Sequence, residues 1–342
     1  MKPARKVDLE IIRIVAVLLI IFNHTDGYIF YTETSNILTW IFSVGMACIC
    51  RAGVPLFFMV SGALLLSKDE TIKELLCKRG VRILTVLFVA SVFYYIFDVF
   101  RYKMPDAGIK DFWVKLCACD IRESLWFLYA YFMILLTLPF FRIMVKYAEQ
   151  KLIQYLFGLK VIFSLIIPLL RILFDFPLFL DAGFVDDFIF YMILGYYMET
   201  HNICKEKKKT IYAELACFVG CIAADMAIMR IYFLNTGGYT QEISELFICV
   251  MTPIVFRMCQ KISEKFEKND IMRRMIVYAG QCVFGIYLLD NFVRWQLLPL
   301  YLFLCEKTIG VFACSVYVSG TFILGFIYTA ILRKIPFMKK YL

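Results

Sequence analysis

Long apolar stretches, separated by short polar connections, recur along the whole chain. Runs long enough to cross a lipid bilayer occur about ten times. They lie near residues 9–27, 38–66, 81–100, 124–141, 152–173, 187–198, 210–230, 242–257, 275–296 and 309–332. This pattern predicts an all-α fold, a polytopic membrane helix bundle of about ten transmembrane helices. Because the connections are too short to hold a soluble module, residues 1–342 are expected to form a single integral-membrane domain.

Lysine and arginine are distributed unevenly between the alternating connections. With the N-terminus placed in the cytoplasm, the cytoplasmic connections carry 25 of the 37 basic residues, whereas the opposite side carries six. This excess follows the positive-inside rule and predicts that both termini are cytoplasmic. The formal net charge of +9 is therefore a topology signal, and a nucleic-acid partner is not expected.

The amino-acid composition agrees with a protein that is embedded in a lipid bilayer. The chain is 62% hydrophobic, with a mean hydropathy of +0.75, whereas soluble domains are about half apolar. Most of its 13 cysteines lie inside apolar runs, where a thiol behaves as a small hydrophobe. With only two histidines and no Cys-x-x-Cys pair, no metal site is expected.

The first apolar run carries Arg13 and His24 inside it. Eleven helical steps separate them, which is about 20° from full turns, so both point the same way about 16 Å apart along the axis. Intramembrane charge on one face costs free energy unless it lines a cavity. Glu10, three residues before the arginine, can hold it. We interpret this face as a site, although His24 alone would suit an interfacial helix end.

The second run contains RAGVPLFFMVSGALLL, from Arg51 to Leu66. Pro55 must kink or break a continuous helix, and Ser61 with Gly62 supplies a small surface for close helix approach. A bent span with a packing notch explains this pattern as well as a functional site does. Arg51, well inside the apolar run, favours the site.

A basic stretch, LCKRGVRIL, begins the third run and contains Lys78, Arg79 and Arg82. It can act as a stop signal that contacts anionic lipid, or as a phosphate-binding rim for a nucleotide-bearing donor.

Further polar and aromatic residues lie in the later runs. Trp126, at the start of the fourth run, is typical of an interfacial anchor. Asp290 and Arg294 are four residues apart, the spacing of a self-neutralising ion pair on one helix face. Other charges near span ends, Arg171 and Arg230 among them, are expected to snorkel.

The motifs together resemble those of acyltransferase family 3, the bacterial membrane O-acyltransferases of surface polysaccharides. The resemblance rests on the Arg13-x10-His24 pair with Glu10, followed in family order by further motifs between Asp8 and Trp295. These motifs are RAGVPLFFMVSG, KRGVRIL, SLWFLYAYF, FIFYMILGYYM and FGIYLLD. Two positions depart from the family pattern, since Ser124 and Asp290 stand where the family has histidines.

This resemblance implies an acyl-coenzyme A donor, commonly acetyl-coenzyme A, and a glycan or lipid-linked sugar as acceptor, at the bacterial cytoplasmic membrane. His24 would then be the general base, although transfer through a histidine adduct is an alternative. Arg13, held by Glu10, would orient the donor or stabilise developing negative charge. Arg51 and Ser61 would shape the channel. The basic rim would bind the donor's phosphates.

Transport is the competing function, because ten spans with buried charges can also move a small solute. A transporter would move a labelled solute without consuming acetyl-coenzyme A, whereas an acyltransferase would release free coenzyme A once its acceptor is supplied. The sequence does not specify the acceptor, transfer to oxygen or nitrogen, or the oligomeric state.

Overall fold

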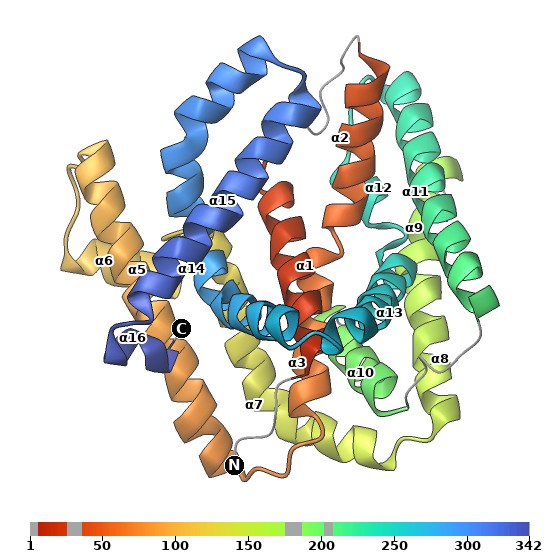
Figure 1. The fold of residues 1–342 in the computed structure, drawn as a ribbon, viewed down its shortest axis with the longest axis horizontal. Helices are drawn as coiled ribbons and strands as arrows, with labels where there is room; N and C mark the ends of the chain where they lie inside the picture. The colour runs from red at the N-terminus through yellow and green to blue at the C-terminus, as the bar shows by residue number, and fades with distance from the viewer. Residues whose placement is uncertain (1–5, 26–35, 175–186, 202–207, 342) are drawn as a thin grey trace. The chain divides into compact units, whose positions relative to one another are not determined.

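The computed structural model describes residues 6–25, 36–174, 187–201 and 208–341, and these ranges fold into helices without any strand (Figure 1). Seven helical stretches within them are long and apolar enough to cross a membrane. They are Ile37–Leu65, Ile72–Tyr102, Glu123–Tyr147, Gln150–Phe174, Ile211–Thr236, Asp270–Lys307 and Gly310–Leu332. The predicted all-α membrane bundle is thereby confirmed. The number of about ten spans and the cytoplasmic termini stay predictions.

The three remaining predicted runs are also helical, but they lie in shorter or more polar helices. The first run forms α1 (Val7–Asn23) with 17 residues, and the sixth forms α10 (Asp187–Thr200) with 14. The eighth run lies largely in α13 (Ile248–Glu267), whose C-terminal half is charged. Their placement therefore depends more on packing than on length or hydropathy.

The chain divides into two compact units. Unit 1 comprises Met1–Leu66 and Ala148–Ile327, and unit 2 comprises Ser67–Tyr147 and Tyr328–Leu342. The other helices of unit 1 are α2 (Ile37–Cys50), α3 (Gly53–Leu65), α8 (Gln150–Val161), α9 (Ile167–Phe174), α11 (Lys208–Thr236), α12 (Gln241–Glu245), α14 (Asp270–Lys307) and most of α15 (Gly310–Leu332). Those of unit 2 are α4 (Ile72–Glu74), α5 (Val81–Tyr102), α6 (Ile109–Cys117), α7 (Trp126–Tyr147) and α16 (Pro336–Tyr341).

Helix α1 lies in the core of unit 1, packed against α3, α13 and α14 (Figure 1). Its apolar residues Ile12, Val17 and Ile21 have no exposed surface. Acidic residues Asp8 and Glu10 occupy its first turn, where negative charge interacts favourably with the helix dipole. The first helix is therefore surrounded by protein, which is the setting that a charged helix face needs.

The second run is broken as the proline predicts. Helix α2 ends at Cys50 and α3 begins at Gly53. Pro55 is the third residue of α3, in the first turn, where its missing N–H has no intrahelical partner to lose. A Cβ at Gly53 would lie 2.9 Å from Cγ1 of Ile20, so this glycine lets the start of α3 approach α1.

Helices α3 and α10 make the closest helix contact of unit 1. A Cβ at Gly62 would overlap the main chain of Met192, and one at Gly195 would overlap that of Met59. Each helix thus places a glycine against the backbone of the other, the small-residue contact typical of membrane helices. The close-approach surface predicted at Gly62 is confirmed.

In unit 2, a π-helical segment, Leu75–Gly80, joins α4 to α5. A capping box closes the start of α4, because Thr71 and Glu74 bind each other's main chain. This places the predicted basic stretch at the junction of the two helices.

Candidate functional site

The C-terminal end of α1 meets α14 through a buried polar contact. Nδ1 of His24, the residue that caps α1, lies 2.5 Å from Oδ2 of Asp290. The Asp290 side chain has no exposed surface, whereas that of His24 is 23% exposed. One turn further along α14, Nε of Arg294 donates to both carboxylate oxygens at 3.1 and 3.2 Å. The three side chains form a contiguous imidazole–carboxylate–guanidinium cluster.

Arg294 also binds the main chain at the end of α1. Its Nη1 donates to the carbonyl oxygen of His24 at 2.9 Å, and the Tyr317 hydroxyl donates to the carbonyl oxygen of Arg294 at 2.8 Å. The last carbonyls of a helix lack intrahelical partners, so this bond satisfies one of them. The ion pair expected between Asp290 and Arg294 is present, and His24 is a third member that the spacing did not indicate.

This arrangement orients the imidazole for proton transfer. Asp290, held by Arg294, faces Nδ1 of His24, so its carboxylate can accept from Nδ1–H, and in that tautomer Nε2 carries the lone pair. Within the described part of the chain, no hydrogen bond engages Nε2. A neutral imidazole oriented by a buried carboxylate is the arrangement that accepts a proton from a hydroxyl in hydrolytic enzymes.

A second charged pair lies nearer the N-terminus of α1. Nη1 of Arg13 donates to both oxygens of Glu10 at 3.2 Å, and the Glu10 side chain is only 4% exposed. Gly280 of α14 makes room for it, because a Cβ there would overlap the Glu10 side chain. Helix α14 therefore contacts α1 at Gly280 and again at Asp290. Both predicted residues of α1, Arg13 and His24, lie on one uninterrupted helix and its cap.

Two further predicted residues lie on the segment formed by α2 and α3, also in unit 1. Arg51, the cap of α2, donates from Nε to Oγ of Ser244 at 3.4 Å and lies 3.8 Å from Oε1 of Glu245. The Ser61 hydroxyl donates to the carbonyl oxygen of Phe57, within α3, at 2.9 Å. Arg51 thus faces α12, and Ser61 is bonded to its own helix.

The predicted basic rim lies in unit 2, where oxygens of the same unit hold its cations. Lys78 donates to Oε1 of Glu74 at 3.0 Å and is well exposed. Arg82 donates to the carbonyl oxygen of Tyr341, in α16, at 2.9 and 3.3 Å. The third cation, Arg79, belongs to a larger network.

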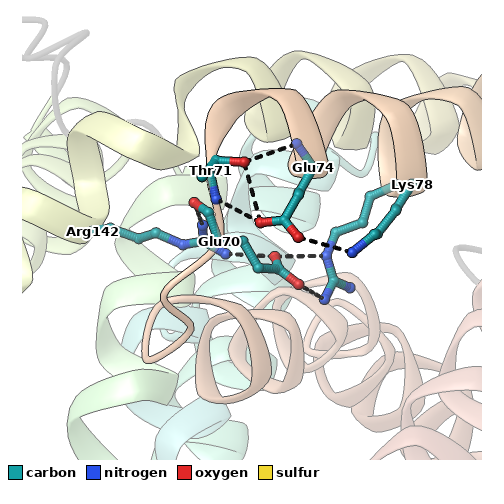
Figure 2. A network of polar contacts seen from close by, with 6 residues as sticks. Glu70, Thr71, Glu74, Lys78 and Arg142 are labelled. Carbon is teal, nitrogen blue, oxygen red and sulfur yellow. Dashed lines mark hydrogen bonds and ion pairs between the residues drawn. The ribbon is translucent and has the colours of Figure 1, made fainter.

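Glu70 is the centre of that network, much of which Figure 2 shows. Nε and Nη2 of Arg79 donate to its carboxylate oxygens at 3.1 and 2.7 Å. Arg142, near the end of α7, donates from Nη2 to Oε2 at 3.0 Å and from Nη1 to the main-chain oxygen of Glu70 at 3.2 Å (Figure 2). These bonds, chiefly the one from Arg79, lower the pKa of Glu70 to about 2. Two guanidinium groups therefore converge on one carboxylate.

Sequence reasoning did not identify Glu70 and Arg142. Glu70 lies in a short polar connection, and Arg142 follows 72 residues later near the end of an apolar run. Basic residues at the ends of membrane helices are common, so neither position carries a distinctive local signal.

Trp126 and Ser124 also belong to unit 2. Trp126 begins α7, is 37% exposed and packs edge-on against Phe127, with ring centroids 6.3 Å apart. Ser124 is buried in the short 3₁₀ turn Glu123–Leu125. Unit 1 thus contains the predicted residues of α1, α2, α3 and α14, and unit 2 contains the basic rim and the tryptophan.

Helices that can cross a bilayer, with an oriented histidine among them, define a polytopic membrane protein with a candidate acid–base site. The model of acyltransferase family 3, described as an acyltransferase domain, matches residues 6–333, so the chain belongs to this family. It is a multi-pass membrane acyltransferase. Neither a search of curated proteins nor one of solved structures gives a match.

Proposed function

We propose that the protein transfers an acyl group, acetyl in the first instance, from acyl-coenzyme A to a hydroxyl of a cell-surface glycan or lipid-linked sugar at the bacterial cytoplasmic membrane. The observation that supports this most is the contact of His24 with the buried carboxylate of Asp290. The contact orients the imidazole, and base-assisted attack by a hydroxyl requires an oriented proton acceptor.

In this mechanism, Nε2 of His24 accepts the proton of the acceptor hydroxyl as its oxygen attacks the thioester carbonyl carbon. Asp290 stabilises the imidazolium that forms, and it does so without taking the proton. The carbon–sulfur bond then breaks, and His24 returns the proton to the departing sulfur. The products are the acyl ester and free coenzyme A, so no proton is gained or lost overall.

Arg13 and the basic rim are assigned supporting roles. The Arg13 guanidinium, held by Glu10, would orient the donor or stabilise the negative charge that develops on the thioester oxygen. Arg51 and Ser61 would line the donor's route. Lys78, Arg79 and Arg82, each now bound to an oxygen of the same unit, offer the cations that donor phosphates prefer.

The test replaces His24. We expect His24→Ala to lose acceptor-dependent release of free coenzyme A, by roughly 10²- to 10⁴-fold, because general base catalysis typically contributes that much. The matched control is His201→Ala, which removes the other histidine, an exposed residue whose Nδ1 lies 3.1 Å from Oγ1 of Thr200. The purified, inserted protein is assayed with acetyl-coenzyme A and a panel of glycan and lipid-linked acceptors.

Near-normal turnover of His24→Ala would contradict the proposed base. Solute movement without any release of coenzyme A, in the wild type, would instead support the transport alternative.

A further inference from the structure

A pocket of about 360 Å³ lies between the C-terminal ends of α9 and α11, which run side by side in unit 1 (Figure 1). Its volume falls within the range of small-molecule sites. The wall is amphipathic, because branched apolar side chains such as Ile228 and Ile231 alternate with polar ones. The polar residues are Arg171, Tyr232, Asn235 and Thr236.

Arg171 differs from the other arginines in the apolar runs of unit 1. Arg13, Arg51 and Arg294 each form an ion pair with a carboxylate, and Arg230 lies over the Phe233 ring with its guanidinium carbon 5.6 Å from the ring centroid. Arg171 has no such partner among the described residues. Arg171 is exposed in the last turn of α9, so its five donors are available to water or to an anion.

The other polar groups extend the site on the α11 side. The Thr236 hydroxyl donates to the carbonyl oxygen of Tyr232 at 2.8 Å and accepts from the Gly238 N–H at 3.3 Å, which leaves its oxygen one lone pair for a further donor. The Asn235 carboxamide supplies two donors and one acceptor beside it. A sugar or phosphate ester would meet both kinds of group here.

The helices that line the pocket are the most outward-facing spans of unit 1. In the apolar 18-residue stretch within Gln150–Phe174, only 11% is buried inside the protein. The buried share of the corresponding stretch is 22% in Ile211–Thr236 and 61% in Ile37–Leu65. Apolar helix faces left exposed in this way are covered by lipid chains. A headgroup in the pocket would therefore be next to surfaces that accept its own hydrocarbon chain.

We propose that this pocket binds the phosphate headgroup of a polyprenyl-type lipid that carries the acceptor sugar. This rests on the proposed function, since it names where its acceptor is held. The planar Arg171 fork would bind phosphate oxygens through two parallel hydrogen bonds, and Asn235 and Thr236 would bind sugar hydroxyls. The hydrocarbon chain would lie along the exposed apolar faces of α9 and α11.

Binding is tested on the full-length protein in detergent, without acyl donor, by native mass spectrometry and thermal shift. The probes are a polyprenyl phosphate, the matching polyprenol without phosphate, and inorganic phosphate. We expect Arg171→Ala to weaken polyprenyl phosphate binding roughly 10- to 100-fold, since a hydrogen bond to a charged group contributes that much. Arg230→Ala, which removes an equal charge from the same helix pair outside the pocket lining, should bind as the wild type does.

Several outcomes would overturn the site. Wild-type affinity in Arg171→Ala shows that this arginine only snorkels. If inorganic phosphate stabilises the protein against thermal unfolding as much as polyprenyl phosphate does, the pocket binds a free anion. If the polyprenol binds as tightly as polyprenyl phosphate does, the pocket binds hydrocarbon alone. If Arg171→Ala does not fold, Arg171→Lys, which keeps the charge without the fork, should bind several-fold more weakly, and Asn235→Ala provides a second variant.

The two proposals fail separately. His24→Ala should bind polyprenyl phosphate normally while transfer is lost. Lipid binding without transfer to any acceptor would leave the site standing and remove the proposed reaction. If Arg171→Ala transfers normally and changes neither the acceptor KM nor polyprenyl phosphate binding, the proposed reaction stands and the lipid site is removed.

Discussion

At the scale of single residues, Asp290 of α14 has a demanding position in the core of unit 1. Its carboxylate is fully buried, and an isolated buried charge costs several kcal/mol. Two groups compensate it, the Arg294 guanidinium and the His24 imidazole. Asp290 stands where the family resemblance predicts a histidine. In the structure, the Asp290 carboxylate contacts the His24 imidazole directly.

We predict that Asp290→Asn lowers kcat by about 10²- to 10⁴-fold with little change in KM for the acyl donor. The amide oxygen can still accept from Nδ1–H, but an amide cannot stabilise the imidazolium. Steady-state kinetics measure the split, and Asp290→Glu should restore part of kcat. Since both residues act in one step, Asp290→Asn in the His24→Ala background should cost little more, and fully additive losses would contradict the pairing.

In unit 2, Glu70 is a carboxylate held by two guanidinium groups, those of Arg79 and Arg142. Its pKa in the folded protein, about 2, lies below the ordinary glutamate value of 4.5, so its ionised form favours folding. That contribution is complete above about pH 4.5 and is lost as the pH falls towards 2. Glu70→Gln should therefore be less stable at neutral pH, by about 1 kcal/mol after solvent screening, and should lose less of its remaining stability on acidification.

Thermal unfolding of the purified protein from pH 7 to pH 3 measures this difference. The control is Asp106→Asn, at an exposed carboxylate outside the network. A wild type and a Glu70→Gln variant that lose stability in parallel would show that the network does not stabilise the fold.

At the scale of helices, the close contacts of unit 1 depend on glycines at facing positions. Gly62 and Gly195 allow α3 and α10 to meet backbone to backbone, and Gly280 accommodates Glu10 between α1 and α14. Lipid is as apolar as the helices are, so burial contributes little to their association and tight packing contributes more. Gly280 therefore determines how closely α14 approaches α1, the helix that His24 caps.

We predict that Gly62→Leu destabilises the protein by several kcal/mol, because its side chain would overlap the Met192 main chain, which cannot move without shifting α10. The measurement is the midpoint of thermal unfolding in detergent. Gly220→Ala serves as the control, since a Cβ there meets nothing within 4 Å and alanine favours the helix, so its midpoint should be unchanged or raised. A Gly62→Leu midpoint equal to that of the wild type would refute the contact.

At the scale of the whole molecule, charge distribution and helix length bear on different questions. Seven of the described helical stretches satisfy the requirement for crossing a membrane, while α1 and α10 are short and surrounded by other helices. The uneven distribution of Lys and Arg between connections concerns orientation only, and it predicts cytoplasmic termini.

Reporter insertions test that orientation. Alkaline phosphatase, which is active only outside the cytoplasm, should be inactive when fused after Leu342 and active when inserted after Gly237, in the turn that follows α11. A cytoplasmic fluorescent reporter at the same two places should give the opposite result. Phosphatase activity at Leu342 would reverse the predicted topology.

Much of the fold could be predicted because it depends on local properties. Apolar periodicity and length predicted helices, and Pro55 predicted the break between α2 and α3, because a proline ring excludes the preceding turn wherever it occurs. Gly62 predicted a close contact for an equally local reason, the absence of a side chain. Helical geometry alone predicted that Arg13 and His24 lie on one face of the first helix.

The sequence by itself therefore determined the helical class, the breaks and the composition of each helix face. Tertiary structure alone decided which faces meet. His24 and Asp290 are 266 residues apart, Glu70 and Arg142 are 72 apart, and the pocket joins two helices whose apolar faces resemble many others. An apolar face is compatible with lipid or with any helix of similar shape, so periodicity cannot specify its neighbour. Only the packing of side chains and glycines in three dimensions does so.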